Sequence, residues 1–231
     1  MELPRNDAHL PEALWLSDRY RSLLKSLLLG LAAASLALVF AKLGGEVLEG
    51  DTHSFDLYVL RLAQEMRASY PWMIDAVRDL SGLGSTTVIT LFTLVCVGYL
   101  VLVSARTTAL LVCAAVTSGT VLVSLFKAGF GRARPDVAFA EMVASGLSFP
   151  SGHASISALA FLTLGALIAS SRSSTTERLY ILAAASLMTL LVGLSRVALG
   201  VHWATDVLGG WALGAGWALA WLLVARGLVR R

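Results

Sequence analysis

The chain has 231 residues, of which 57% are hydrophobic and only 14% are charged, and its mean hydropathy is +0.75. A soluble domain carries about 25% charged residues, so this composition argues against a soluble protein and predicts an integral membrane protein. The net charge is only +3, and the basic residues form no patch on a polar segment, so we expect no nucleic acid partner.

Apolar runs of about 20 residues predict six membrane-spanning helices. The predicted spans are approximately residues 22–41, 85–104, 107–126, 154–171, 179–199 and 207–225. The first run is too long for a signal-peptide core and lacks a clear small-residue cleavage site, so we interpret it as an uncleaved span. The expected fold class is all-α: a polytopic six-transmembrane-helix bundle, formed as a single domain over residues 1–231. Both cysteines, Cys96 and Cys113, lie within spans and are expected to be apolar packing residues.

The segment between the first two spans, about residues 43–84, contains a predicted amphipathic helix. Its apolar residues recur at helical spacing: Phe55, Tyr58, Val59, Leu62 and Met66. Arg61, Gln64 and Glu65 fall on the opposite side. This pattern predicts a helix lying in the membrane interface, which either caps the bundle or guides a lipid toward a pocket.

The distribution of basic residues predicts the orientation in the membrane. With six spans, one side of the membrane receives Arg5, Arg19, Arg21, Lys25, Arg106, Arg172, Arg178, Arg226, Arg230 and Arg231. The long segment on the other side has four basic residues diluted by seven acidic ones. Both termini are therefore expected to be cytoplasmic.

Three polar clusters then fall at the outer ends of spans. The first is residues 127–135, with Lys127, Arg132 and Arg134; the second is residues 150–153, with Ser151, Gly152 and His153; the third contains Ser195, Arg196, His202 and Asp206. The six-span topology brings all three clusters to one membrane face. Four helix ends could then surround a single pocket.

The second cluster is typical of an anion site. Ser151 is well placed as the N-cap of the fourth span, and a helix N-terminus offers unpaired backbone N–H groups to an anion. Gly152 would let the backbone approach an oxyanion closely, and His153 would stand in the first turn. By itself, this string also fits a purely structural helix cap.

The third cluster pairs a histidine with a carboxylate. His202 and Asp206 are four residues apart and would share one face of a helix. A carboxylate beside a histidine fixes its tautomer and stabilises its cationic form. By itself, the pair also fits a structural hydrogen bond.

Three cations complete the set: Lys127, Arg134 and Arg196. Arginine suits bidentate phosphate contacts and lysine a point-charge contact, so these residues predict a phosphoryl-transfer site. Alternatively, the three cations could be interfacial anchors that reach lipid headgroups. That interpretation explains neither Gly152 nor the two histidines, His153 and His202.

The clusters match a known signature in order and spacing. Lys127 precedes Arg134-Pro135 by six intervening residues, Pro150 to His153 follow, five residues separate Ser195-Arg196 from His202, and three separate His202 from Asp206. The chain therefore resembles the type 2 phosphatidic acid phosphatase superfamily, which shares its site with vanadium haloperoxidases and glucose-6-phosphatase.

The resemblance implies a role for each residue. His202 would be the nucleophile that forms a phosphohistidine, Asp206 would orient it, and His153 would protonate the leaving oxygen. The phosphoryl oxygens would be held by Lys127, Arg134, Ser151, Gly152 and Arg196. Arg132 would be an auxiliary contact. The resemblance implies neither a metal ion nor another cofactor.

The expected function is that of a lipid phosphatase in a bacterial cell (inner) membrane, with its site on the periplasmic or extracellular face. Its partners would be the bilayer and a phosphorylated lipid, first undecaprenyl pyrophosphate, with phosphatidylglycerophosphate, phosphatidic acid and lipid A phosphate as alternatives. A haloperoxidase and a non-catalytic scaffold are remote alternatives. The sequence leaves the oligomeric state open.

Overall fold

The computed structural model describes residues 10–229, and their side chains from residue 20 onward. Arg5, Arg230 and Arg231, which contribute to the predicted orientation, lie outside the described residues. The elements in chain order are α1 (Leu10–Glu49), α2 (His53–Ser69), α3 (Met73–Gly82), α4 (Thr86–Leu102), α5 (Arg106–Phe130), the 3-10 helix η2 (Val137–Phe139), α6 (Gly152–Ser170), α7 (Thr175–Ala198) and α8 (Ala204–Val229).

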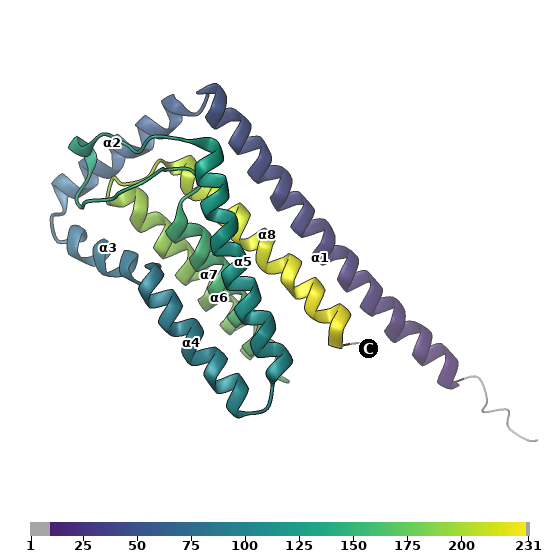
Figure 1. Cartoon of the computed structure of the whole chain (residues 1–231). Helices are drawn as coiled ribbons and strands as arrows, with labels where there is room; N and C mark the ends of the chain where they lie inside the picture. Colours follow the sequence, from purple (N-terminus) through teal and green to yellow (C-terminus); the bar gives the residue numbers. More distant parts are fainter. Residues whose placement is uncertain (1–9, 230–231) are drawn as a thin grey trace, which may run out of the picture.

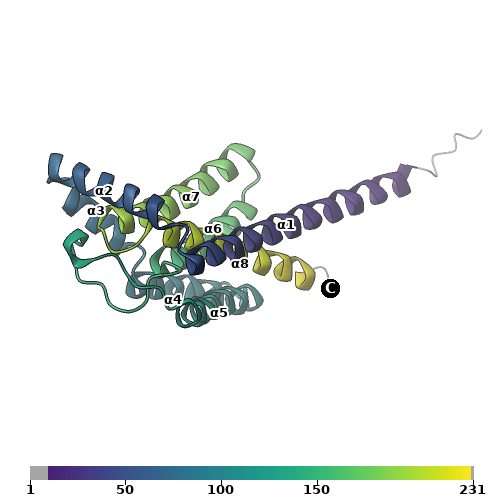
Figure 2. The same cartoon turned by 90° about the horizontal axis from the view of Figure 1, so that it is seen from above.

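The long helices form a bundle whose centre is α6 (Figure 1). Helices α7 and α8 make the most extensive contacts with α6, α5 packs on another side of it, and α1 lies along α8. Helices α2 and α3 lie across one end of the bundle, while the N-terminal part of α1 projects past the opposite end (Figures 1 and 2). This arrangement confirms the predicted all-α membrane fold.

Within the described part of the chain, five helices are long and apolar enough to cross a membrane: the Tyr20–Glu49 part of α1, then α5, α6, α7 and α8. The remaining predicted span, residues 85–104, is helix α4, which is 17 residues long. Together with α3, from which it is bent by 43°, α4 makes up the sixth candidate span. Large side chains on the outer helices are exposed, including Leu31 at 66% and Val95 at 69%, as a lipid-facing surface requires.

Helix α1 is longer than the predicted span 22–41. It continues through Gly44 to Glu49. The ring of Phe130 packs against Gly44, and a Cβ at that position would lie 2.5 Å from Cζ of Phe130. The helix ends at Gly50, whose φ of +84° is a left-handed conformation that favours glycine. The first outer segment therefore begins near residue 50 rather than 43.

The predicted interfacial helix is α2, and the sequence did not predict α3. Most of the predicted apolar face of α2 is exposed, with Tyr58 68% exposed and Met66 44% exposed, whereas Val59 packs against the core. The buried residues of this helix are Asp56, Leu60 and Arg67. The face turned toward the protein is therefore partly charged, and those charges act at the site described below.

Glycines on α8 allow α6 to approach closely. A Cβ on Gly214 would lie 2.1 Å from the carbonyl oxygen of Ser155, and one on Gly210 would lie 2.9 Å from that of Ser151. The two backbones are thus in direct contact, which places the first turn of α6 beside the first turn of α8.

Candidate active site

The three clusters lie at the end of the bundle that α2 and α3 cover (Figure 1). Their side chains come from the last turn of α5 (Lys127), the following loop (Arg132, Arg134), the first turn of α6 (Ser151, Gly152, His153), the last turn of α7 (Ser195, Arg196), the next turn (His202) and the first turn of α8 (Asp206). Helix α5 extends to Phe130, beyond the predicted end at residue 126, so Lys127 lies within the helix.

His202 and Asp206 are in contact, with 3.1 Å between Nδ1 and Oδ2. The predicted reason was wrong, because His202 precedes α8, which begins at Ala204. The chain reverses at Gly200, whose φ is +70°, and Asp206 then folds back to accept the backbone N–H of Trp203 at 2.9 Å. The contact between His202 and Asp206 therefore comes from a turn that Asp206 caps, and not from a shared helix face.

Asp206 is 0% exposed, and both of its oxygens accept hydrogen bonds. Besides His202 and the Trp203 amide, Oδ2 accepts from the hydroxyl of Ser148, and Oδ1 accepts from Nη1 of Arg132 at 2.7 Å. These donors all favour the ionised carboxylate. The carboxylate therefore has a fixed orientation before any substrate arrives.

The other ring nitrogen of His202, Nε2, lies 3.0 Å from Nη1 of Arg134. Because a guanidinium only donates, Nε2 carries the lone pair and Nδ1 carries the proton. Burial lowers the pKa of His202 to about 4, against an opposing effect of Asp206. The imidazole is thus neutral at neutral pH, and its unprotonated nitrogen, Nε2, lies next to the cation of Arg134.

Lys127 and Arg134 are held by backbone carbonyl groups of the loop before α6. Nζ of Lys127 donates to the carbonyls of Leu147 at 2.7 Å and Ser148 at 3.2 Å. Arg134 donates to the carbonyls of residues 145, 146 and 201. Burial lowers the pKa of Arg134, although a guanidinium stays charged at physiological pH. Carbonyl oxygens thus orient both cations without neutralising them.

Ser151 is the N-cap residue of α6, as predicted, but its hydroxyl does not cap the helix. Within the described part of the chain, its buried Oγ has no hydrogen-bond partner. A buried hydroxyl without a partner is uncommon and costs about 1–3 kcal/mol. A Cβ on Gly152 would meet only Cε of Lys127 at 3.7 Å, an ordinary contact, so packing does not require a glycine here. Both observations fit a first turn that is arranged for a ligand.

Arg196, like Ser151, has a buried donor atom that makes no hydrogen bond with the described residues. Its Nη1 donates to the hydroxyl of Ser81 on α3 at 2.5 Å and contacts Sδ of Met142 at 3.6 Å. Its Nε is buried and, in residues 20–229, has no hydrogen-bond partner. Ser195 bonds the carbonyl of Val192 on its own helix at 2.7 Å, a structural contact.

Helices α2 and α3 supply site contacts that sequence reasoning missed. Asp56 is 0% exposed and pairs with Arg132 at 2.6 Å. Arg67 donates to the carbonyls of Ala198 and Phe139 and pairs with Glu141 at 3.1 Å, tying the loop before α6 to the end of α7. The available signal was the spacing of Asp56 and Arg67, eleven residues apart, which puts both charges on one side of this amphipathic helix. Arg132, expected as an auxiliary phosphate contact, is engaged by Asp56 and Asp206.

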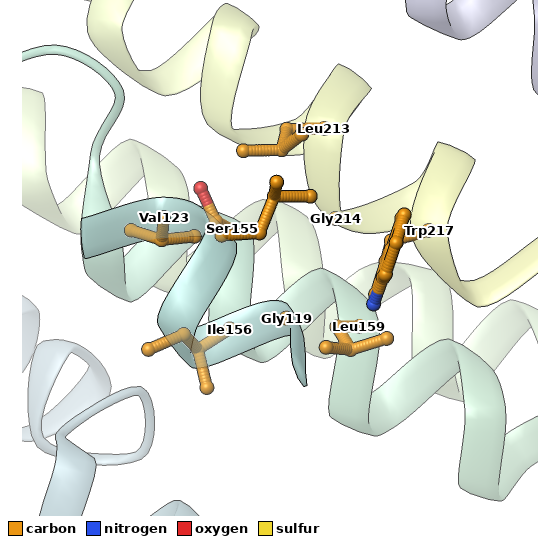
Figure 3. A pocket seen from close by; sticks show the side chains of 9 residues that line it. Gly119, Val123, Ser155, Ile156, Leu159, Leu213, Gly214 and Trp217 are labelled. Carbon is orange, nitrogen blue, oxygen red and sulfur yellow. The ribbon is translucent and has the colours of Figure 1, made fainter. Parts of the chain in front are cut away.

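A small pocket lies elsewhere, between α5, α6 and α8 in the membrane-embedded part (Figure 3). Its lining is mostly apolar: Gly119, Leu122, Val123, Ser155, Ile156, Leu159, Leu213, Gly214 and Trp217. None of the candidate site residues belongs to this lining. Separately, the described residues contain no group of three or more His, Cys, Asp or Glu side chains that could hold a metal ion.

Known proteins resemble this chain over most of its length. A family model described as the PAP2 superfamily matches residues 108–230. Phosphatidylglycerophosphatase B of Bacillus subtilis (strain 168) is 31% identical over 185 residues, which cover 78% of this chain and 88% of that protein. The crystal structure of a transmembrane PAP2 type phosphatidylglycerolphosphate phosphatase from Bacillus subtilis superimposes with a TM-score of 0.77 at 26% identity, covering 86% of this chain and 97% of that chain.

Proposed function

The chain belongs to the PAP2 superfamily and is a membrane lipid phosphatase, and from this premise we propose that it hydrolyses phosphatidylglycerophosphate through a phosphohistidine formed on His202. The observation that carries the proposal is that, among the described residues, Oγ of Ser151 and Nε of Arg196 are both buried donors without a hydrogen-bond partner. Both belong to the cluster that surrounds the neutral imidazole of His202. A bound phosphoryl group would satisfy both.

The phosphoryl group would be held by charge-assisted hydrogen bonds. Lys127, Arg134 and Arg196 supply the cations, while Ser151 and the free N–H groups of the first turn of α6, at Gly152 and His153, supply the neutral donors. These donors stabilise the charge of the transition state. Removing one such preorganised donor typically costs about 10²–10³ in rate.

The reaction has two displacements. Nε2 of His202 attacks phosphorus, the bond between phosphorus and the lipid oxygen breaks, and His153 gives its proton to that oxygen. Asp206 accepts the Nδ1–H of His202 and stabilises the cationic phosphoimidazole. In the second step His153 takes a proton from a water molecule, the water oxygen attacks phosphorus, and the bond to Nε2 breaks. Inorganic phosphate leaves and His202 returns to its neutral form.

The choice of substrate follows the names of the related proteins. Both relatives are named for phosphatidylglycerophosphate, which was an alternative at the level of the sequence. Undecaprenyl pyrophosphate, the first expectation, is not confirmed and rests on the family resemblance alone. We therefore place phosphatidylglycerophosphate first and keep undecaprenyl pyrophosphate as the competitor in the test.

Phosphate release by the purified protein tests this proposal. The panel contains phosphatidylglycerophosphate, phosphatidic acid, undecaprenyl pyrophosphate and lipid A phosphate, each in the same detergent. We expect the highest kcat/KM with phosphatidylglycerophosphate and no release by His202→Ala. A preference for undecaprenyl pyrophosphate would overturn the substrate, and release by His202→Ala would overturn the mechanism.

The site is proposed to face outward, with both termini in the cytoplasm. The supporting observation is that all three clusters, α2 and α3 gather at one end of the bundle (Figure 1). The excess of basic residues at the opposite end, as in Arg106, Arg172 and Arg226, supports a cytoplasmic location for that end.

A further inference from the structure

Asp56 on α2 is buried next to the catalytic pair although it is remote from it in the chain. Its Oδ1 accepts the backbone N–H of Thr205 at 2.9 Å, and its Oδ2 accepts the Thr205 hydroxyl at 2.7 Å and Nη2 of Arg132 at 2.6 Å. All three partners donate, so the contacts suit an ionised carboxylate. Thr205 directly precedes Asp206, and Asp56 therefore holds the first turn of α8 at that point.

Arg132 connects Asp56 to Asp206. Its Nη1 donates to Oδ1 of Asp206 at 2.7 Å while its Nη2 donates to Asp56, and its side chain is only 13% exposed. Asp56 and Asp206 are each 0% exposed. One cation is thus shared between two buried carboxylates, and the trio carries a net charge of −1 beside His202.

We propose that Asp56 is a positioning residue for the phosphatase reaction: through Arg132 it sets the orientation and the negative charge of Asp206, and so stabilises the cationic phosphoimidazole of His202. This inference rests on the proposed function. Without Asp56, Arg132 would pair with Asp206 alone and neutralise the carboxylate on which His202 depends. With Asp56 present, Arg132 is shared between two carboxylates and neutralises Asp206 only in part. Asp206 can then still attract the Nδ1–H of His202.

An anchor for α2 alone would not need this arrangement. Buried ion pairs are weak sources of stability compared with apolar packing of the same volume, because both charges lose their water. Leu60, on the same helix, is 0% exposed and already provides an apolar contact. Asp56 instead pairs with Arg132, and Arg132 donates to Oδ1 of Asp206, the carboxylate oxygen that His202 does not contact.

The electrostatic consequence is a shift of the pH profile. His202 is surrounded by Asp206, by Arg134 at its Nε2 and by Lys127. Arg132 lies beyond Asp206, and the imidazole of His153 and the guanidinium of Arg196 lie nearby. Asp56→Asn removes one negative charge from this set, which disfavours every protonated group within it. Both limbs of the kcat profile should therefore move to lower pH, which a purely structural loss would not cause.

The first experiment compares Asp56→Asn with Asp75→Asn in purified full-length protein. Asp75 is a matched control, since it lies on α3 with its side chain 84% exposed and pairs with Arg78. For Asp56→Asn we expect kcat to fall about 10- to 100-fold, the size typical of a partner behind a reacting group, with KM nearly unchanged. Asp75→Asn should match the wild type in kcat, KM and pH profile.

A second experiment combines Asp56→Asn with Arg132→Gln. Because Asp56 acts through Arg132, the double variant should have about the kcat of Arg132→Gln alone. Multiplying losses would overturn the inference, as would an unshifted pH profile in Asp56→Asn. If Asp56→Asn does not fold, Arg132→Lys replaces it: one ammonium cannot hold both carboxylates as the guanidinium does, so wild-type kcat in that variant would overturn the inference. A wild-type protein that releases no phosphate from any lipid would instead defeat the proposed function.

Discussion

Nη1 of Arg134 lies 3.0 Å from Nε2 of His202. This contact leaves the lone pair of Nε2 pointing at a cation, and the proton of the ring on the side of Asp206. An incoming phosphoryl oxygen can take over the hydrogen bond from Arg134, which leaves the lone pair facing phosphorus. The contact therefore keeps the nucleophile in its reactive tautomer before the substrate binds.

Replacing the nucleophile should abolish turnover. We expect His202→Ala to lower kcat by at least about 10³-fold, since the covalent route is lost, as measured by phosphate release. His53→Gln is the matched control, because His53 is exposed and contacts the ring of Trp203 rather than the phosphate-binding residues. Near-wild-type activity in His202→Ala would contradict the assignment.

The pH dependence of His202 can be measured directly. Burial lowers its pKa to about 4 from the ordinary value near 6.5, and a lowered pKa in a histidine means that the neutral form persists to lower pH. The ¹⁵N signals of His202 in labelled protein should therefore stay those of neutral Nδ1–H imidazole from about pH 8 to pH 5. Arg134→Gln should raise the pKa, because the charge of Arg134 disfavours protonation. A wild-type midpoint near pH 6.5 would contradict the structure.

Ser151→Ala should separate activity from stability. Its hydroxyl is buried and, among the described residues, unpaired, so removing it should leave the melting temperature unchanged or raise it. A hydrogen bond to a charged phosphoryl oxygen is worth about 1.5–3 kcal/mol, so kcat/KM should fall about 10- to 100-fold. The control is Ser157→Ala on the same helix, whose hydroxyl already bonds the carbonyl of Ala154 at 3.2 Å. Unchanged kcat/KM in Ser151→Ala would remove Ser151 from the site.

Phosphate release should not require a divalent metal ion. Lys127, Arg134 and Arg196 supply the positive charge that a metal supplies in other phosphatases. We expect full activity after dialysis against EDTA, with a metal-dependent phosphatase treated in parallel to verify chelation. A loss of activity that Mg²⁺ or Zn²⁺ restores would contradict this mechanism.

The orientation can be tested with single cysteines in a background lacking Cys96 and Cys113. Val143 is 96% exposed in the loop before α6, and Ser173 is exposed in the connection between α6 and α7 at the other end of the bundle. A membrane-impermeant thiol reagent added to intact cells should label Val143→Cys and spare Ser173→Cys. The reverse pattern would place the site in the cytoplasm.

The ends of the helices could not be predicted accurately from local sequence patterns. The predicted third span stops at residue 126, where polar residues begin, yet α5 continues to Phe130 and ends at Gly131, whose φ is +63°. Hydropathy reports the lipid-embedded length of a helix, whereas the helix itself ends where a residue adopts a capping conformation. Helix α3 was missed because it is only 10 residues long and carries no span signal.

The membrane class, the spans and the convergence of the three clusters could all be predicted from the sequence. Hydropathy suffices for this because lipid leaves the backbone few alternatives to a helix, and the topology then assigns each span end to a side. The contacts that hold the site in place became visible only in the folded structure. Arg132 contacts Asp56, Asp206 contacts Ser148, and Arg196 contacts Ser81. Each contact joins residues far apart in the chain, and no local periodicity encodes it. The pairing of His202 with Asp206 shows both contributions: their spacing predicts the contact, while the turn at Gly200 and the packing of α8 on α6 produce its geometry.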